Sequence, residues 1–243
     1  MALTNDYEPA KGNIEITKAV SWDEGDGTTS TKVPADQLNN ISFALYNSKD
    51  ATKPVDQWTL TSFTYDEQAK VYKLNIPNLP LDTYTVQEQN NINGYTWTAT
   101  VNSQAATPVA SKVSDSVTLD ANGEPEGISF GNNYEKMLGD LTIKKTSNGT
   151  TTPANTQFTV KNSAGTVVKS FTYSEMTNGE YTITGLPAGE YTVTEVSSSA
   201  QVSNYKLNIT YDQTNGKYTV EDDKTTTANV TNKYTPLGTV RIE

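Results

Sequence analysis

The 243-residue sequence contains neither cysteine nor histidine. Without cysteine there is no disulfide and no thiol nucleophile, and without histidine there is no imidazole base and no usual ligand for a transition metal. Most familiar layouts of hydrolases and metalloenzymes are therefore excluded, and we expect no cofactor and no metal site. We expect no enzyme acting on a separate substrate either, because no phosphate-binding glycine loop is present and no pair of carboxylates stands out.

Long apolar runs and clustered basic charge are also lacking. No apolar stretch approaches the ~20 residues of a membrane span, and the start, Met1-Ala2-Leu3-Thr4-Asn5, lacks the charged and apolar regions of a signal peptide. We therefore expect no membrane insertion in this segment, and export or anchoring signals outside it. A net charge of -10 and a pI near 4.6 make nucleic acid an unsuitable partner, since phosphate binding requires a basic surface.

What the sequence does contain is typical of short β-strands. Thr, Val, Tyr and Ile recur, and Pro and Gly interrupt them, which predicts an all-β protein with little helix. In the second half the predicted strands are residues 141–145, 157–162, 167–173, 180–184, 190–196, 205–211, 217–221 and 228–234. Strands of this length between turn signals such as Asn178-Gly179 and Asn215-Gly216 predict a β-sandwich. The first half follows the same plan, with longer connections predicted at residues 21–37 and 105–127.

Three kinds of segment recur along the chain and indicate a tandem repeat. They are Tyr-Thr-Val-x-Glu at 84–88 and 191–195, an opening strand after Gly12, Gly139 and Gly238, and an Asn-x-Tyr before each opening, at 5–7, 132–134 and 232–234. We predict one domain at residues 11–135 and a second at 136–236, both of ordinary domain size. Residues 1–10 then end a preceding module or linker, and residues 237–243 begin a following module or tail, as in an array. The linkers of a few residues predict domains arranged end to end.

A lysine, a glutamate and an asparagine share the face of apolar residues in each half. Residues two apart in a strand point to the same side, so these polar side chains are predicted to point inward. The two sets are Lys18, Glu88 and Asn132, and Lys145, Glu195 and Asn232. The neighbouring Lys144 and Asn133 fall on the opposite, solvent face. Burying a lone charge costs several kcal/mol, so we predict that the three inward side chains of each half meet.

Such a meeting favours one reaction. Loss of water drives a lysine toward its neutral, nucleophilic amine and a glutamate toward its protonated form. We hypothesise that the lysine Nζ attacks the asparagine side-chain carbonyl while the glutamate polarises that carbonyl and relays protons, which releases ammonia and leaves an isopeptide cross-link. The reaction occurs once per domain. The alternative is that these side chains lie at strand ends, exposed or merely hydrogen-bonded, with no bond.

Four segments of the second half carry a family resemblance. They are Leu186-Pro187-Ala188-Gly189-Glu190-Tyr191-Thr192-Val193-Thr194-Glu195, Leu141-Thr142-Ile143-Lys144-Lys145, Pro153 ahead of Phe158, and Val230-Thr231-Asn232-Lys233-Tyr234. Together they resemble two tandem collagen-adhesin B-type (Cna B-type) domains, the immunoglobulin-like or transthyretin-like β-sandwiches of Gram-positive surface adhesins and sortase-assembled pilins. The first half matches less closely, because Leu79-Pro80-Leu81-Asp82-Thr83-Tyr84 lacks the usual glycine.

The resemblance implies an autocatalytic intramolecular isopeptide bond in each domain. It would join Lys18 to Asn132 with Glu88 as the catalytic residue, and Lys145 to Asn232 with Glu195 as the catalytic residue. The implied function is a stalk of a cell-surface adhesin or pilus-like protein, which projects a binding domain and resists force and proteolysis. The implied location is extracellular, anchored to the cell wall through a region outside this chain. No Leu-Pro-x-Thr-Gly sorting signal and no Tyr-Pro-Lys-Asn pilin motif occur here, so an adhesin stalk fits better than a pilus shaft.

The expected partners are neighbouring domains of the same array. The alternative function is an adhesin module that binds host extracellular protein or glycan through the insertions of the first domain. Candidate contacts for such a ligand are Trp22, Trp58, Tyr95 and Trp97, although aromatics at strand spacing are more often core residues. The clustered carboxylates of residues 22–27 suit a hard cation such as calcium, but their spacing departs from the standard calcium loop and favours a solvated loop.

Overall fold

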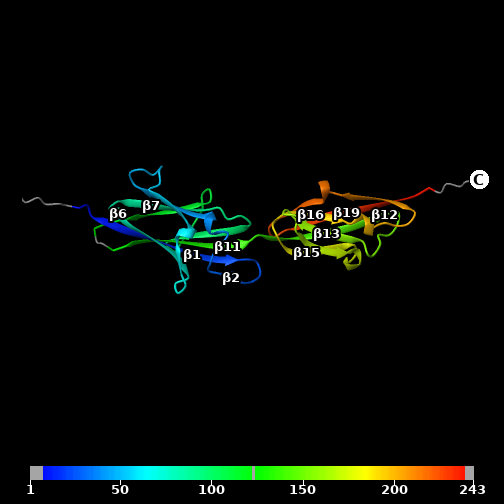
Figure 1. Ribbon diagram of the computed structural model, residues 1–243, viewed down its shortest axis with the longest axis horizontal. Helices are drawn as coiled ribbons and strands as arrows, with labels where there is room; N and C mark the ends of the chain where they lie inside the picture. The colour runs from blue at the N-terminus through cyan, green and yellow to red at the C-terminus, as the bar shows by residue number, and fades with distance from the viewer. Residues whose placement is uncertain (1–7, 122–123, 239–243) are drawn as a thin grey trace, which may run out of the picture. The chain divides into compact units, whose positions relative to one another are not determined.

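The computed structural model describes residues 8–121 and 124–238, and the chain divides into two compact units, residues 1–136 and 137–243. Each unit is built from two β-sheets, and helix is limited to short 3-10 turns (Figure 1). The prediction of an all-β protein with two β-sandwiches is therefore confirmed. Most of the predicted array fragments, including the Asn-x-Tyr at 5–7 and the strand after Gly238, lie outside the described residues. The end-to-end arrangement and the domain limits stay predictions.

In the first unit, one sheet has the order β5-β6-β1-β11-β8-β9, with β2 paired to β1, and the other has the order β10-β7-β3-β4. The strands are β1 Lys11–Asp23, β2 Thr29–Ser30, β3 Ile41–Asn47, β4 Asp56–Thr59, β5 Thr64–Asp66, β6 Val71–Pro80, β7 Thr83–Asn90, β8 Tyr95–Val101, β9 Gln104–Ala106, β10 Lys112–Thr118 and β11 Glu126–Lys136. The predicted connection at 105–127 is wrong, because β10 lies within it. Only Val113 of β10 is buried, so this polar edge strand shows little hydrophobic alternation.

The second unit has the sheets β15-β12-β19-β17 and β14-β13-β16-β18. Its strands are β12 Leu138–Asn148, β13 Gln157–Asn162, β14 Val167–Thr172, β15 Glu180–Pro187, β16 Gly189–Glu195, β17 Tyr205–Tyr211, β18 Lys217–Val220 and β19 Thr225–Pro236. All eight predicted strands form. The strands β12 and β19 run longer than predicted, because their mutual pairing continues to Asn148, beyond the last inward residue of the first strand.

The first and last strands of each unit pair in parallel, and this pairing sets the candidate site. In the first unit β1 lies beside β11 (Figure 1), with Lys18 opposite Phe130 and Val20 opposite Asn132. In the second unit Lys145 of β12 lies opposite Val230 of β19. In both units the lysine is therefore two residues out of register with the asparagine, and the two share one face of the sheet.

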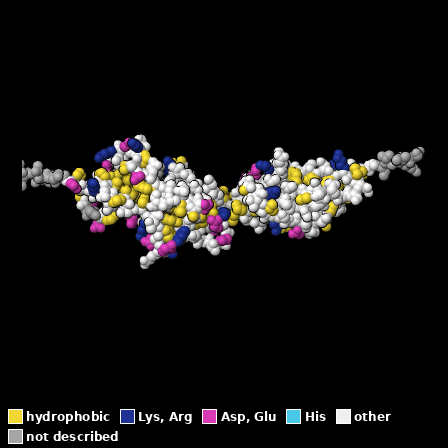
Figure 2. Space-filling view, viewed as in Figure 1, with side chains coloured by type: hydrophobic (Ala, Val, Ile, Leu, Met, Phe, Trp, Pro, Cys, Tyr) yellow, Lys and Arg dark blue, Asp and Glu magenta, His cyan; other side chains and the backbone are white. Residues whose placement is uncertain are grey.

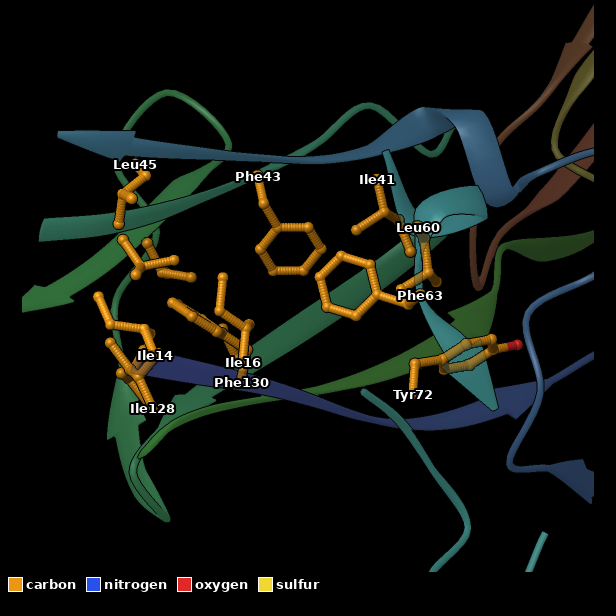
Figure 3. Close-up of a cluster of buried hydrophobic side chains, with 14 of the residues drawn as sticks. Ile14, Ile16, Ile41, Phe43, Leu45, Leu60, Phe63, Tyr72, Ile128 and Phe130 are labelled. Carbon is orange, nitrogen blue, oxygen red and sulfur yellow. The ribbon is translucent and has the colours of Figure 1, made fainter. Parts of the chain in front are cut away.

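Separate hydrophobic cores fill the two sandwiches. Figure 3 shows Ile41 and Phe43 of one sheet of the first unit facing Ile16 and Phe130 of the other. The Phe43 ring lies 5.7 Å from that of Phe130. The second core contains Leu141, Ile143, Phe158, Val160, Phe171, Leu186, Tyr191, Val193, Tyr218, Val220, Ala228 and Val230. Burial of each large apolar side chain stabilises the folded state by about 1.5–3 kcal/mol. The polar residues that lie among these side chains are therefore surrounded by closely packed apolar groups.

The outer surface is mixed in charge. On the face of the first unit seen in Figure 2, acidic and basic side chains are interspersed. Within the described residues, none of the helical segments has the length and apolarity that a membrane crossing requires.

Candidate functional site: a buried lysine, glutamate and asparagine in each unit

In the first unit the structure brings the three predicted residues into contact between the two sheets. Lys18 on β1 and Asn132 on β11 come from one sheet, and Glu88 on β7 comes from the facing sheet. The Nζ atom of Lys18 donates to both carboxylate oxygens of Glu88 at 2.9 Å. The Nδ2 atom of Asn132 donates to Oε1 of the same carboxylate at 2.5 Å. The lysine and the glutamate are completely buried, and the asparagine is 5% exposed.

The second unit brings the corresponding residues together with a different contact at the lysine. Asn232 Nδ2 donates to Oε1 of Glu195 at 2.6 Å, and Lys145 Nζ lies 3.2 Å from Oε2. The ion pair is close, but it is not aligned as a hydrogen bond, and Oε2 has no hydrogen-bond donor among the described residues. Lys145 instead donates to the backbone oxygen of Thr146 at 3.1 Å. One carboxylate oxygen thus faces the amine and the other faces the amide.

The glutamate faces the amide nitrogen of each asparagine, whereas the sequence predicted a contact with the amide oxygen. The amide N–H groups turn toward the carboxylate oxygens, which accept their hydrogen bonds. The Oδ1 atoms of Asn132 and Asn232 are consequently buried with no hydrogen-bond donor among the described residues. A buried oxygen without a donor costs about 1–3 kcal/mol, so each site carries an unfavourable contribution as it stands.

A tyrosine for which the sequence predicted no role completes each site. Asn132 Nδ2 donates to the hydroxyl of Tyr134 at 2.9 Å, and Asn232 Nδ2 to that of Tyr234 at 3.2 Å. The Tyr234 hydroxyl in turn donates to the Ala200 backbone oxygen at 2.8 Å. The signal was present in the sequence, because the Asn-x-Tyr spacing of two residues places both side chains on one face.

Burial changes the protonation of the site. It lowers the pKa of Lys18 and the pKa of Lys145, since an ammonium group loses its hydration. The charge of the partner glutamate, Glu88 or Glu195, opposes this effect. Burial, followed by the charge of Glu88, raises the pKa of Tyr134. The amines are thus brought nearer to the neutral form that attacks a carbonyl, and the Tyr134 hydroxyl keeps its proton.

The surroundings of the tyrosine differ between the two units. In the first, the indole of Trp22, itself 2% exposed, lies 4.8 Å from the Tyr134 ring. In the second, the backbone of Gly149 passes so close that an added Cβ would lie 2.2 Å from the Tyr234 backbone oxygen. Gly149 has φ +99, a conformation that other residues rarely adopt. The asparagines beside these tyrosines, Asn132 and Asn232, are 5% and 0% exposed.

The indole of Trp22 is held by a residue of its own loop, residues 22–27, whose carboxylates suggested a calcium site. Glu24 Oε1 accepts from Trp22 Nε1 at 2.7 Å and from the Tyr95 hydroxyl at 2.8 Å, and Oε2 accepts from Lys136 Nζ at 2.5 Å. Asp26 accepts from the backbone and hydroxyl of Thr28. These carboxylates hold their own loop, and within the described ranges no cluster of acidic side chains could hold a metal ion.

The remaining candidates from the sequence lie elsewhere. Lys144 pairs with Glu180 at 2.9 Å, and Asn133 Nδ2 donates to Glu135 at 3.1 Å, both on the outer side of their strands. Of the four aromatics considered for ligand binding, Trp22 is a core residue, and Trp58, Tyr95 and Trp97 pack against the core partly buried.

Comparison with known proteins gives a family match for the second unit. A family model described as a domain of unknown function, DUF5979, matches residues 141–235. The collagen-adhesin B-type name therefore stays a resemblance. None of the curated proteins matches the sequence.

Several solved structures are similar to the chain. The Bacillus anthracis TIE protein is 26% identical with a TM-score of 0.44, over 92% of this chain, which spans only 34% of that one. The C-terminal fragment of the pilus adhesin SpaC from Lactobacillus rhamnosus GG is 19% identical with a TM-score of 0.47, over 96% of this chain and 100% of that one. GBS52, the minor pilin of Streptococcus agalactiae, is 16% identical with a TM-score of 0.36, over 95% and 100%. Similarity at these scores does not transfer a site or an activity.

Proposed function

We propose that each unit forms an intramolecular isopeptide bond without any helper, between Lys18 and Asn132 in the first unit and between Lys145 and Asn232 in the second. One observation carries the proposal: the same buried contact of lysine, glutamate and asparagine occurs twice, at the same parallel register. If the lysine and the asparagine were merely strand-end residues with no bond between them, a carboxylate that reaches them from the facing sheet would have no role. Glu88 and Glu195 are the proposed catalytic residues.

The contacts suit an amide exchange in which the carboxylate carries a proton. The neutral Nζ of the lysine attacks Cγ of the asparagine, so that the Nζ–Cγ bond forms and the Cγ–Nδ2 bond breaks. A proton leaves Nζ and reaches Nδ2 through the carboxylate, and Nδ2 departs as ammonia. In the second unit Oε2 of Glu195 lies beside the amine and Oε1 beside the leaving nitrogen, which is the arrangement that such a transfer requires. Holding the lysine amine and the asparagine carbonyl in fixed positions away from water supplies much of the acceleration of the reaction.

The proposed bonds would make each unit a load-bearing element. They join the first and last strands of a unit, through which a pulling force enters and leaves it. By analogy with a disulfide, closing a loop of this size stabilises the folded unit by about 4–5 kcal/mol. We propose that the chain is a stalk of a Gram-positive cell-surface adhesin or pilus-like protein, whose partners are neighbouring domains. The aromatics considered for a host ligand contribute to the core, so no observation favours the adhesin-module alternative.

Intact mass of the denatured chain tests the bonds. Two bonds predict a mass lower than the calculated value by two molecules of ammonia, and a proteolytic digest should contain one cross-linked peptide pair for each unit. The full calculated mass would refute the proposal for both units.

Variants assign the catalytic carboxylates. Glu195→Ala should regain the mass of one ammonia and lose only the cross-linked pair that contains Lys145, and Glu88→Ala should do the same for the pair that contains Lys18. Glu190→Ala is the matched control, because Glu190 is half-exposed and pairs with Lys217 at 2.7 Å outside the site. If Glu195→Ala retains both bonds, another group carries the proton.

A further inference from the structure

Each candidate asparagine is held by a second group besides the glutamate, the hydroxyl of the tyrosine two residues further on. Tyr134 is fully buried and Tyr234 is 3% exposed. Each hydroxyl accepts from the same Nδ2 atom that the glutamate accepts from. Two separate acceptors therefore converge on one amide nitrogen in each unit.

In the second unit the direction of this hydrogen bond is fixed. A tyrosine hydroxyl has one hydrogen, and that of Tyr234 is donated to the Ala200 backbone oxygen at 2.8 Å. Toward Asn232 the hydroxyl can only accept, so the group facing it must be the amide NH2 and cannot be the amide oxygen. With Glu195 Oε1 on the same nitrogen at 2.6 Å, the opposite amide orientation would place Oδ1 against two acceptors.

The fixed orientation matters for the chemistry proposed above. When Nδ2 faces the glutamate, the nitrogen that must leave lies next to the group that delivers its proton. When the amide is turned by half a rotation, the leaving nitrogen is away from the carboxylate, and ammonia cannot depart as readily. Oδ1 has no hydrogen-bond donor among the described residues, so the orientation of the amide rests on the two acceptors at Nδ2.

We propose that Tyr234, and through the same contact Tyr134, is a positioning residue of the isopeptide reaction, whose hydroxyl keeps the leaving nitrogen of the asparagine on the catalytic glutamate. The inference rests on the proposed isopeptide function and assigns a further residue to it. The tyrosine neither gives nor takes a proton in the reaction. Among the described residues no hydrogen bond is donated by the Tyr134 hydroxyl, so we expect a stronger effect at Tyr234.

The test is the rate of bond formation in the full chain. Wild type and Tyr234→Phe are synthesised in a cell-free reaction, and samples denatured at intervals are analysed by intact mass and by the cross-linked peptides of each unit. Phenylalanine keeps the ring and removes the hydroxyl. We expect the Lys145–Asn232 bond to form about tenfold to a hundredfold more slowly, in the range of a misplaced reacting group. The Lys18–Asn132 bond of the same chain should form at the wild-type rate.

A matched control removes a tyrosine hydroxyl elsewhere in the same sandwich. Tyr191 is also buried, and its hydroxyl donates to the Pro187 backbone oxygen at 2.7 Å, away from the asparagine. Tyr191→Phe should leave the rate of the Lys145–Asn232 bond unchanged. Circular dichroism checks that each variant is folded, and Tyr134→Phe repeats the experiment in the first unit should Tyr234→Phe fail to fold.

Repeating Tyr234→Phe in the Asn232→Asp chain distinguishes an effect on the orientation of the amide from an effect on the packing of the site. In Asn232→Asp the reacting group is a symmetric carboxyl, which releases water and has no nitrogen to orient. Tyr234→Phe should therefore slow bond formation with asparagine and leave that with aspartate nearly unchanged. Equal slowing in both backgrounds would show that the tyrosine acts through packing and would overturn the inference.

The outcomes also separate the two proposals. A wild-type chain at its full calculated mass contradicts the isopeptide function and the tyrosine role together. A wild-type chain that loses two ammonia molecules, with Tyr234→Phe and Tyr134→Phe equally fast, contradicts only the tyrosine role.

Discussion

The two units contain the same three polar residues but engage the lysine differently. Lys18 donates to both oxygens of its glutamate, whereas Lys145 is drawn partly to the backbone oxygen of Thr146. The lysine and asparagine strands have the same register in both units. Strand pairing therefore fixes which residues meet, and the local surroundings of the lysine decide how closely the amine approaches the carboxylate.

The surroundings of the two tyrosines also differ. The indole of Trp22, from an inserted loop, packs on the Tyr134 ring, whereas Gly149, in a backbone conformation that favours glycine, approaches the Tyr234 backbone oxygen. All three tryptophans, Trp22, Trp58 and Trp97, belong to the first unit, so tryptophan fluorescence reports that unit separately from circular dichroism of both.

Removing the lysine should give the largest effect in either unit. Lys18→Met and Lys145→Met should each remove the proposed bond of their unit, at a cost of about 4–5 kcal/mol, and leave a buried glutamate without its lysine, at a further cost of about 3–5 kcal/mol. Urea unfolding measures both losses. Lys73→Met is the control, because its pair with Asp66 is partly exposed and contributes about 1 kcal/mol or less. Equal and small losses in all three variants would contradict the comparison.

Variants that lack the bond should become more stable as the pH rises. In Asn132→Ala the folded state holds Lys18 at a pKa below its ordinary 10.5, so the unfolded chain binds more protons between the two values. The free energy of unfolding should therefore increase as the pH approaches 10.5, and the corresponding Asn232→Ala should behave alike.

The wild type should lack this dependence, because in the proposed bond the lysine is an amide and does not titrate. Asn132→Ala combined with Lys18→Met removes the titrating group and is the control. Urea midpoints at several pH values, followed by tryptophan fluorescence, measure the effect in the first unit. A midpoint that falls with pH only in the variant that keeps Lys18 would contradict the assignment.

Gly149→Ala should damage only the second unit. The added Cβ would meet the Tyr234 backbone oxygen, and φ +99 is unfavourable for alanine, so we expect a loss of about 1–3 kcal/mol and slower formation of the Lys145–Asn232 bond. Gly165→Ala is the control, because Gly165 also has positive φ, at +79, but has open space around it. Thermal unfolding and the cross-linked peptides measure both variants. Similar losses for the two would mean that backbone strain alone accounts for the effect.

Glu24→Gln should give the smallest effect, confined to the first unit. The hydrogen bond from Lys136 and then that from Trp22 lower the pKa of Glu24 below its ordinary 4.5. Its contribution is therefore present above pH 4.5 and is lost as the pH falls through the lower, folded value. The side chain is 40% exposed, so we expect about 1 kcal/mol or less. Glu67→Gln, at a still more exposed pair with Lys32, is the control, and a tryptophan signal that changes equally in both would rule out the anchoring role.

Much of the fold could be predicted because its signals are local. Turn dipeptides such as Asn178-Gly179 separate the strands of the second unit, and apolar alternation marks their inner faces. The edge strand β10 could not be found, since it has almost no buried side chain. The inward direction of Lys18, Glu88 and Asn132 follows from the same alternation.

The details of the site could not be predicted, because they depend on contacts between distant segments. The atom of the asparagine that faces the glutamate follows from a carboxyl group on the opposite sheet, which accepts from Nδ2. The hydroxyl of Tyr234 is directed by Ala200, which belongs to a connection between strands and carries no motif. Neither contact has a signature in a single strand.

An all-β chain and two inward sets of lysine, glutamate and asparagine follow from residue type and a period of two, which are properties of each strand alone. The parallel pairing of the first and last strands, two residues out of register at the site, and the carboxylate that joins them from the facing sheet arise only in the folded protein. These contacts join residues such as Lys18 and Glu88, 70 positions apart, and form only when both sheets close around a common core.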